Sequence, residues 1–282
     1  MNSLNSSTFL GITTLMYLFT MVCYFYYLFF RNRKLGLFIK GIIIIGLTVH
    51  TVGLGLRWYE SYKLGYGHIP LSNMYEALIS VSWCTVLVFF VIEQRFKSEI
   101  LGVFLFPIVS IAMAYASLAP GVQDEIEPLI PALQSNWLTY HVLTCFLGYA
   151  AFAVSFGSSI AYLIKNRKGK EISAGSPGML PETDLLDEII YKANAVGFLL
   201  LGIGIITGAI WANYAWGSYW SWDPKETWSL ITWLIYAVFL HARLTRGWRG
   251  NKTAVLSIIG FCGVLFTFFG VNYILPGLHS YA

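Results

Sequence analysis

The sequence carries little charge. Of its 282 residues only 11% are Asp, Glu, Lys or Arg, whereas a soluble domain contains about 25%. So low a content excludes an ordinary soluble domain. The net charge of +4 is small and the basic residues are scattered along the chain, which excludes a nucleic-acid-binding surface.

Cysteine is scarce, and paired cysteines are missing. The four cysteines, Cys23, Cys84, Cys145 and Cys262, each stand alone in an apolar run. This pattern argues against a disulfide framework, a zinc site and a thioredoxin-like redox pair. The C-x-x-C-H motif of covalent haem attachment is also absent, which excludes haem held by thioether bonds.

Long apolar runs are what the sequence has instead. About eight runs reach the roughly 20 residues that a helix needs to cross a bilayer. They predict an all-α polytopic membrane protein, with residues 1–282 as a single integral membrane domain. The first run is expected to remain as a span, because residues 1–30 contain no Lys or Arg and the run is too long for a signal peptide. The predicted spans are 8–30, 35–56, 74–93, 100–119, 138–164, 195–213, 226–243 and 253–275.

The basic residues predict how these spans are oriented. Arg57, Lys63 and Lys225 fall on one side of the predicted spans, and the other 15 of the 18 basic residues fall on the opposite side. Cytoplasmic loops carry the excess of Lys and Arg, so both termini are expected on the extracytoplasmic side. The longest inner connection, 165–192, is expected to be a cytoplasmic-side loop, with its acidic stretch 182–188 as a short surface helix or mobile segment.

One outer connection, 211–228, is rich in tryptophan. It contains five of the ten tryptophans of the chain. An interfacial belt is one interpretation, although a belt needs only one or two rings at each helix end. The other is a flat apolar platform, formed by Trp216, Trp220 and Trp222, for a large planar hydrophobic ligand. Gly217 would let such a ligand approach the backbone closely.

The residues that end this segment predict the start of the next helix. Asp223 fits the N-cap, Pro224 the first helical position and Glu226 the third, which together make a capping box. This local role favours a structural residue at Asp223 over a metal ligand or proton donor.

Two histidines are predicted on the same side as the tryptophans. His141 lies about one turn inside the fifth span, and His279 lies in the C-terminal segment. Two imidazoles from different segments can clamp a porphyrin iron from opposite faces. The alternative for each is a hydrogen-bonded packing residue.

Three further histidines lie elsewhere in the predicted topology. His50 and His241 lie inside predicted spans, where an ionisable side chain is a candidate functional residue. Their predicted depths match poorly for sharing one iron, unless the helices are offset. His68 lies in an outer loop, from which it would line or gate the site that the tryptophans form.

Residues 216–223, WGSYWSWD, closely resemble the WWD signature W-G-x-x-W-x-W-D of haem-handling proteins in cytochrome c maturation. Three families share that signature, namely CcmC, CcmF and CcsA (also called ResC). Length and layout point to CcsA. The segment GHIPLSNMYE at 67–76, His141, His241 and the ending LPGLHSYA also resemble that family, so the likeness covers nearly the whole chain.

The resemblance implies a subunit of the system II cytochrome c synthase, which joins haem to the C-x-x-C-H thiols of apocytochrome c. The partners implied are the membrane subunit CcsB (ResB), the apocytochrome and thiol-reducing thioredoxin-like proteins. The cofactor implied is non-covalently bound haem b, with His141 and His279 as axial ligands. His241 matches the family's transmembrane histidine, whose second ligand comes from CcsB or from His50. The residues implied as the haem platform are Trp216, Gly217, Trp220, Trp222 and Asp223.

Several alternatives stay open on the sequence alone. Arg57 and Lys225 are candidates for binding haem propionates, with interfacial anchoring as the other reading. No residue is an obvious acid or base, so no catalytic residue is predicted, and a haem transporter without ligation activity fits as well. A b-type electron-transfer subunit would need histidine pairs at matched depths, which the spacing does not supply. The bacterial plasma membrane is the expected location, with the thylakoid membrane as the alternative.

Overall fold

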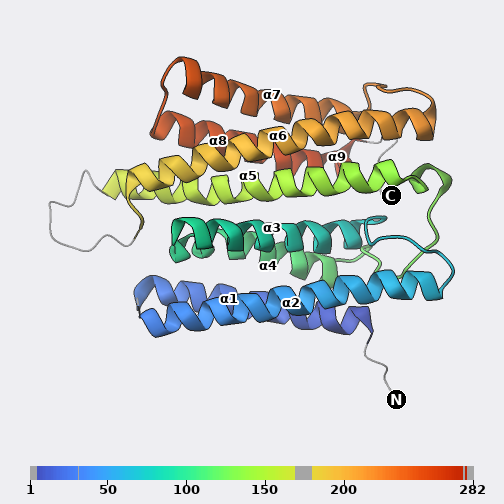
Figure 1. Ribbon diagram of the computed structural model, residues 1–282, viewed down its shortest axis with the longest axis horizontal. Helices are drawn as coiled ribbons and strands as arrows, with labels where there is room; N and C mark the ends of the chain where they lie inside the picture. Colours follow the sequence, from blue (N-terminus) through green and yellow to red (C-terminus); the bar gives the residue numbers. More distant parts are fainter. Residues whose placement is uncertain (1–4, 31, 169–179, 276, 278–282) are drawn as a thin grey trace.

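The computed structural model describes residues 5–30, 32–168, 180–275 and 277, which form a helical bundle (Figure 1). Eight helical spans in this part of the chain are long and apolar enough to cross a membrane, which confirms the predicted all-α class and span number. Short η1 and η2 turns and the π-helical turn η3 interrupt the pattern. The helices are α1 (Ser6–Phe29), α2 (Arg33–Lys63), α3 (Met74–Phe96), η1 (Glu99–Leu101), α4 (Gly102–Leu118), η2 (Pro131–Leu133), α5 (Asn136–Lys168), α6 (Thr183–Trp216), α7 (Pro224–Thr245), α8 (Asn251–Leu265), η3 (Phe266–Gly270) and α9 (Val271–Ile274).

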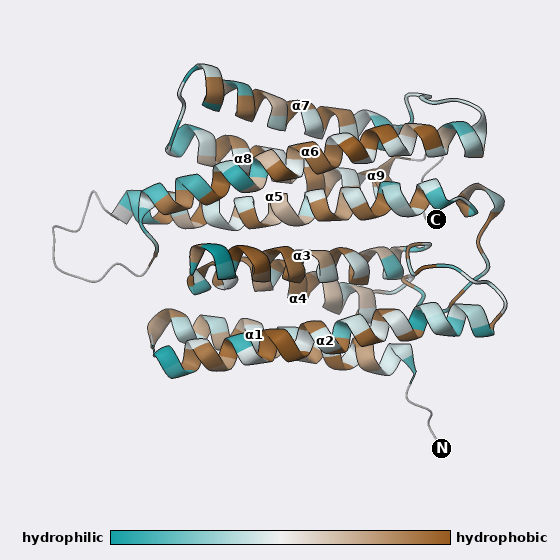
Figure 2. Ribbon diagram, viewed as in Figure 1, coloured by the Kyte–Doolittle hydropathy of each residue, from teal (hydrophilic) through white to brown (hydrophobic). Residues whose placement is uncertain are grey.

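The helices run side by side, with their connections gathered at the two ends of the bundle (Figure 1). We call the end that carries connections 64–73, 119–135 and 217–223 the tryptophan end. The start of α1 lies there too, since the Ser6 hydroxyl donates to Glu60 near the end of α2. Apolar residues line the middle of the helices, and hydrophilic ones gather toward both ends (Figure 2). Which side of the membrane the tryptophan end faces stays a prediction from the charges.

The helices reach further than the apolar runs do. α6 begins at Thr183, so most of the acidic stretch at 182–188 forms its first turns and not part of the expected loop 165–192. Ion pairs explain the extension, because Asp187 lies 2.6 Å from Arg243 and Glu188 pairs with Lys192 one turn later. A helix can continue beyond the membrane through charged residues, because water or ion pairs satisfy their side chains there. A search for apolar runs therefore underestimates the length of the helix.

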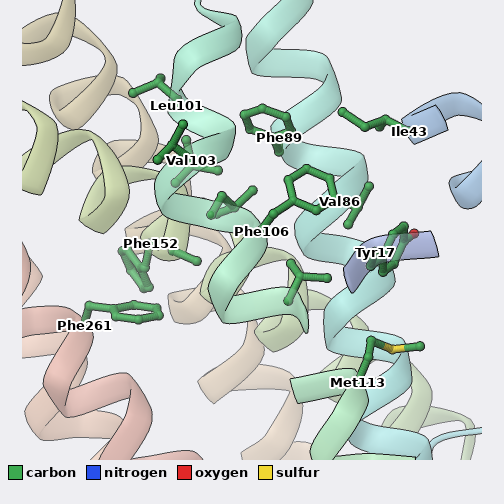
Figure 3. Packing of buried hydrophobic residues seen from close by; sticks show 14 of the residues in the cluster. Tyr17, Ile43, Val86, Phe89, Leu101, Val103, Phe106, Met113, Phe152 and Phe261 are labelled. Carbon is green, nitrogen blue, oxygen red and sulfur yellow. The ribbon is translucent and has the colours of Figure 1, made fainter. Parts of the chain in front are cut away.

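Two groups of helices, α1–α4 and α5–α9, meet along α3 and α5. The core beside this seam is aromatic, with Phe106 packed edge-on against Phe89 and Tyr17 (Figure 3). In a membrane the hydrophobic effect contributes little free energy to helix association, because lipid tails are as apolar as the side chains. Close van der Waals packing therefore holds the helices together. Glycines on α6 allow this at the most extensive helix pair, α5 with α6, where Gly197 lies against Phe152 and Gly204 against Cys145.

Candidate functional site

A cavity of about 410 Å³ opens at the tryptophan end, between α5, α6, α7 and η3. Cavities for small molecules and cofactors occupy roughly 300–1,000 Å³ and are mostly apolar with a few polar groups. This cavity has that character. Of the residues considered from the sequence, its wall includes His141, Trp216, Trp220 and Lys225, and additional wall residues include Trp211, Tyr149, Phe268 and Asn272.

His141 enters the cavity from the first turns of α5 in a defined orientation. Its Nδ1 lies 2.7 Å from the carbonyl oxygen of Gly204 on α6. A carbonyl only accepts, so Nδ1 carries the proton and the ring lone pair lies on Nε2. A Cβ on Gly208 would lie 2.5 Å from Nδ1, so the absence of a side chain there makes room for the ring.

Three tryptophans form the aromatic wall. Trp211 is buried, donates through Nε1 to the carbonyl of Ala132 at 2.8 Å, and lies nearly parallel to the His141 ring with centroids 5.9 Å apart. Trp216 packs edge-on against Trp211 at 4.8 Å, and Trp220 completes the wall. Trp211 was not among the expected platform residues, although it belongs to the tryptophan segment. Continuation of α6 through Trp216 brings both rings to the same cavity.

Trp222 and Gly217 do not line this cavity. The Trp222 side chain is 69% exposed, and its backbone φ of 61° is in the left-handed region. Gly217 is the C-cap of α6 with φ 75°, a conformation that glycine adopts without strain. Its described role is to end the helix and turn the chain toward Trp220. The three tryptophans of this segment that line the cavity are therefore Trp211, Trp216 and Trp220, and a platform for a planar ligand stays a prediction.

Asp223 begins α7 as expected. Its carboxylate accepts from the Lys225 backbone N–H at 2.9 Å, and the Glu226 carboxylate accepts from the Asp223 N–H at 3.2 Å. This confirms the capping box. Gly277 packs here as well, because a Cβ on it would lie 2.5 Å from Asp223 Oδ2. At Gly277, two residues before His279, the chain thus lies against Asp223 at the start of α7. His279 itself lies outside the described residues.

Lys225 lies at the edge of the cavity, beside the π-helical turn. Its Nζ donates to Asn272 Oδ1 at 3.0 Å, and Asn272 Nδ2 donates to the carbonyl of Phe268 at 2.6 Å. Lys225 is the one basic residue among the described residues of the cavity wall. It is positioned to meet an anionic group of a ligand there.

Arg57 is different, because its guanidinium is engaged by other groups of the protein. Its side chain is 1% exposed, and Nε lies 2.7 Å from Glu76 Oε1. Its Nη1 and Nη2 donate to the carbonyls of Asp124 and Glu125 at 2.8 and 3.2 Å. The guanidinium therefore does not line the cavity, which contradicts its expected role in binding a propionate there. It ties connection 119–135 to α2 and α3 because these acceptors, distant in sequence, surround it.

Three other histidines, His50, His68 and His241, do not line the cavity. His50 is fully buried on α2, with Nδ1 3.2 Å from the Tyr17 hydroxyl. His241 is exposed on α7, on the far side of the bundle from α2 (Figure 1). These two cannot share one iron. His68 lies with Nε2 2.9 Å from the Glu127 carbonyl and Nδ1 3.1 Å from the Ile69 carbonyl, and so joins connections 64–73 and 119–135.

Comparison with known proteins identifies similar chains. Residues 71–279 match the family model described as Cytochrome C assembly protein. A Cytochrome c biogenesis protein CcsA from Microcystis aeruginosa is 39% identical, over 100% of this chain and 99% of that protein. Proteins of the same name from Mesostigma viride and Synechococcus elongatus are 39% and 37% identical, covering 90% and 99% of this chain and 89% and 97% of their own.

The fold is also similar to that of a solved structure. The structure of Cytochrome c Heme Lyase CcmF superposes with a TM-score of 0.68 at 15% sequence identity. The alignment covers 95% of this chain and 47% of that one. At this identity the likeness concerns the helical arrangement alone.

Proposed function

Because this chain belongs to the CcsA family of cytochrome c biogenesis proteins, we propose that its cavity at the tryptophan end holds haem b without a covalent bond and presents it to apocytochrome c. The axial ligands in this proposal are His141 and His279. The observation that carries it is the position of the His141 ring, inside an aromatic cavity and hydrogen-bonded through Nδ1.

The residues of the cavity fit a porphyrin. Trp211, Trp216 and Trp220 supply flat apolar surface for a planar ring, and stacking of this kind adds to the energy of burial. The bond from His141 Nδ1 to the Gly204 carbonyl leaves Nε2 as the ligating nitrogen, and bonds of this type orient metal-binding histidines. Lys225 is placed to pair with a propionate. The packing of Gly277 against Asp223 supports a second ligand from His279.

We propose that the residues of the WWD segment contribute to haem binding in two different ways. Trp216 and Trp220 contact haem directly, while Gly217 and Asp223 act through the backbone by ending α6 and beginning α7. Trp222 is exposed, so its contribution to haem binding would come through the rim of the cavity or through a bound partner. In this division Trp222 contributes least to the haem affinity of the isolated chain.

His241 fits a second haem position within the membrane. Its place on the exposed face of α7 suits a ligand completed from outside this chain, and CcsB is the proposed source. His50 is not available for this, since it is buried on α2, and α2 lies across the bundle from α7 (Figure 1). Haem would then pass from His241 to the tryptophan end, which the charges place on the outer face of a bacterial plasma membrane or the lumenal face of a thylakoid.

Thioether formation requires the protein to position haem and the cysteine thiols more than it requires an acid or base. Each cysteine S–H adds across one vinyl group, forming one C–S and one C–H bond with no net oxidation. The protein's residues hold the porphyrin and exclude water, and fixed orientation of the reactants supplies the rate. The thiols must arrive reduced, which assigns a thioredoxin-like reductant as a further partner.

Co-expression tests this proposal and separates ligation from delivery. We expect cells with this chain, CcsB and an apocytochrome to accumulate covalent cytochrome c, and cells lacking this chain to accumulate none. The purified chain should show the absorption spectrum of bis-imidazole haem. Delivery without ligation would instead give haem-loaded protein and only non-covalent haem on the client. A wild-type chain that binds no haem in either setting contradicts the proposal.

Gly208→Ala should weaken haem binding without unfolding the bundle. The new Cβ would lie 2.5 Å from His141 Nδ1, so the ring must shift away from the Gly204 carbonyl. Disturbing the group that orients a metal-binding histidine costs about 10- to 100-fold in affinity. Haem titration of the purified protein measures the change. Gly55→Ala is the matched control, because a Cβ there meets no atom within 4 Å. Equal affinities of the two variants would refute this role for Gly208.

A further inference from the structure

A second hollow lies beside the haem cavity at the tryptophan end. This groove, of about 680 Å³, runs between the last turns of α2 and the first turns of α5. Trp58 and Tyr62 form its α2 side, with ring centroids 6.2 Å apart, and Tyr66 and Ile69 continue it along connection 64–73. These four side chains are between 37% and 59% exposed, so they form an open aromatic surface.

The groove and the haem cavity share one partition. Six residues line both hollows: Leu71, Ser72, Pro128, Leu129, Leu133 and Leu138. Side-chain hydrogen bonds hold this partition in place, with His68 Nε2 2.9 Å from the carbonyl of Glu127, and the Ser80 hydroxyl 3.0 Å from that of Pro70. A group bound in the groove is therefore separated from the cavity by a thin wall of mostly apolar side chains.

The chemistry of the groove indicates what it binds. Its described lining contains no Lys or Arg to bind a lipid phosphate or a haem propionate, and no Asp or Glu. Its one described histidine, His68, has both ring nitrogens at backbone carbonyls, those of Ile69 and Glu127. The lining combines Trp, Tyr, Gly, Ser and Asn, including Ser135 and Asn136, and these residue types are enriched in the binding loops of antibodies. Aromatic anchors with neutral hydrogen-bonding groups suit an extended peptide whose main chain supplies the partners.

We infer that this groove is the docking site for the apocytochrome segment that bears the C-x-x-C-H thiols. The inference rests on the proposed function, which requires two thiols to reach haem in the adjoining cavity. A peptide lying along Trp58 and Tyr62 meets the cavity at Leu71 and Leu133. The partition then lies between the bound segment and the vinyl groups, and a lining whose described residues include no Asp, Glu, Lys or Arg suits clients of differing sequence around the motif.

Photo-crosslinking tests the docking site in the full complex. Tyr62→p-benzoylphenylalanine is introduced into the chain co-expressed with CcsB and an apocytochrome, and the products are identified by mass spectrometry. We expect crosslinks to the client near its C-x-x-C-H motif. Tyr214→p-benzoylphenylalanine is the control, since Tyr214 is 70% exposed on α6 and lines neither hollow. Crosslinks from Tyr62 only to CcsB or to lipid, or equal client crosslinking from both positions, would overturn the inference.

A second measurement separates client binding from haem binding. The Trp58→Ala/Tyr62→Ala variant should need at least about tenfold more apocytochrome for half-maximal ligation, since buried aromatic anchors carry most of the energy of such interfaces. Its haem spectrum should match that of the wild type. An unchanged apocytochrome requirement overturns the docking site. Wild-type protein that binds no haem but crosslinks the client at Tyr62 overturns the haem proposal and leaves the docking site standing.

Discussion

His141→Ala is expected to abolish bis-imidazole haem in the purified protein and to lower covalent cytochrome c formation by at least about 100-fold. The side chain lies in the cavity wall with Nδ1 2.7 Å from the Gly204 carbonyl. Loss of groups that only orient a ligand costs about 10- to 100-fold in metal affinity, so loss of the ligand itself should cost more. His279→Ala should have a comparable effect if the two residues act as a pair.

The adjacent residue provides the control for His141. Tyr140→Ala removes a large side chain that is 58% exposed and does not line the cavity, so haem binding and ligation should stay within about twofold of wild type. Absorption spectra of the purified variants and in-gel haem staining of the client measure both effects. Wild-type bis-imidazole spectra in both His141→Ala and His279→Ala would show that the axial ligands lie elsewhere.

Glu76→Leu should destabilise the fold more than any change at an exposed ion pair. It would leave Arg57 buried without its carboxylate, and both side chains of this pair are 1% exposed. Removing one partner of a buried ion pair costs about 3–5 kcal/mol, because the remaining charge is uncompensated. The same carboxylate accepts from the Ser72 N–H at 2.8 Å and the Ser72 hydroxyl at 2.6 Å, so the start of α3 would also loosen.

Two further variants test this explanation. Glu188→Leu disrupts an exposed pair with Lys192, whose side chains are 48% and 51% exposed, and should cost no more than about 1 kcal/mol. The double variant Arg57→Met/Glu76→Leu should regain much of the lost stability, since no unpaired charge remains. Thermal unfolding in detergent, followed by tryptophan fluorescence, gives the comparison. Equal losses of stability in Glu76→Leu and Glu188→Leu would mean that the burial of Arg57 does not increase the cost of removing its partner.

The expectations met by the structure are those that depend on residues close together in the chain. Each span could be recognised because hydropathy is a local property of about 20 residues. The capping box at Asp223 followed from residues within one helical turn. The position of His141 beside the tryptophans followed from its place near the end of a span on the same side, while its role as a ligand stays a prediction.

The expectations that changed concern partners distant in sequence. Arg57 was an outer cation by position, but its carbonyl partners, Asp124 and Glu125, are 67 and 68 residues away. Trp216 and Trp222 both belong to the WWD motif, so the motif offered no reason to distinguish them. The backbone turn between α6 and α7 separates them, and of the two only Trp216 lines the cavity. Trp211 was overlooked because the helix was expected to end at residue 213, and not at Trp216.

By itself the sequence determined that this chain is a bundle of eight spans, belongs to a haem-handling family and gathers tryptophan at one end, because hydropathy and short motifs are carried by neighbouring residues. Only the tertiary structure decided that His141, Trp211 and Lys225 share a cavity while Arg57 does not. The reason is physical. The direction of a side chain depends on how whole helices pack, and here glycines on α6 set that packing at the residues where His141 enters.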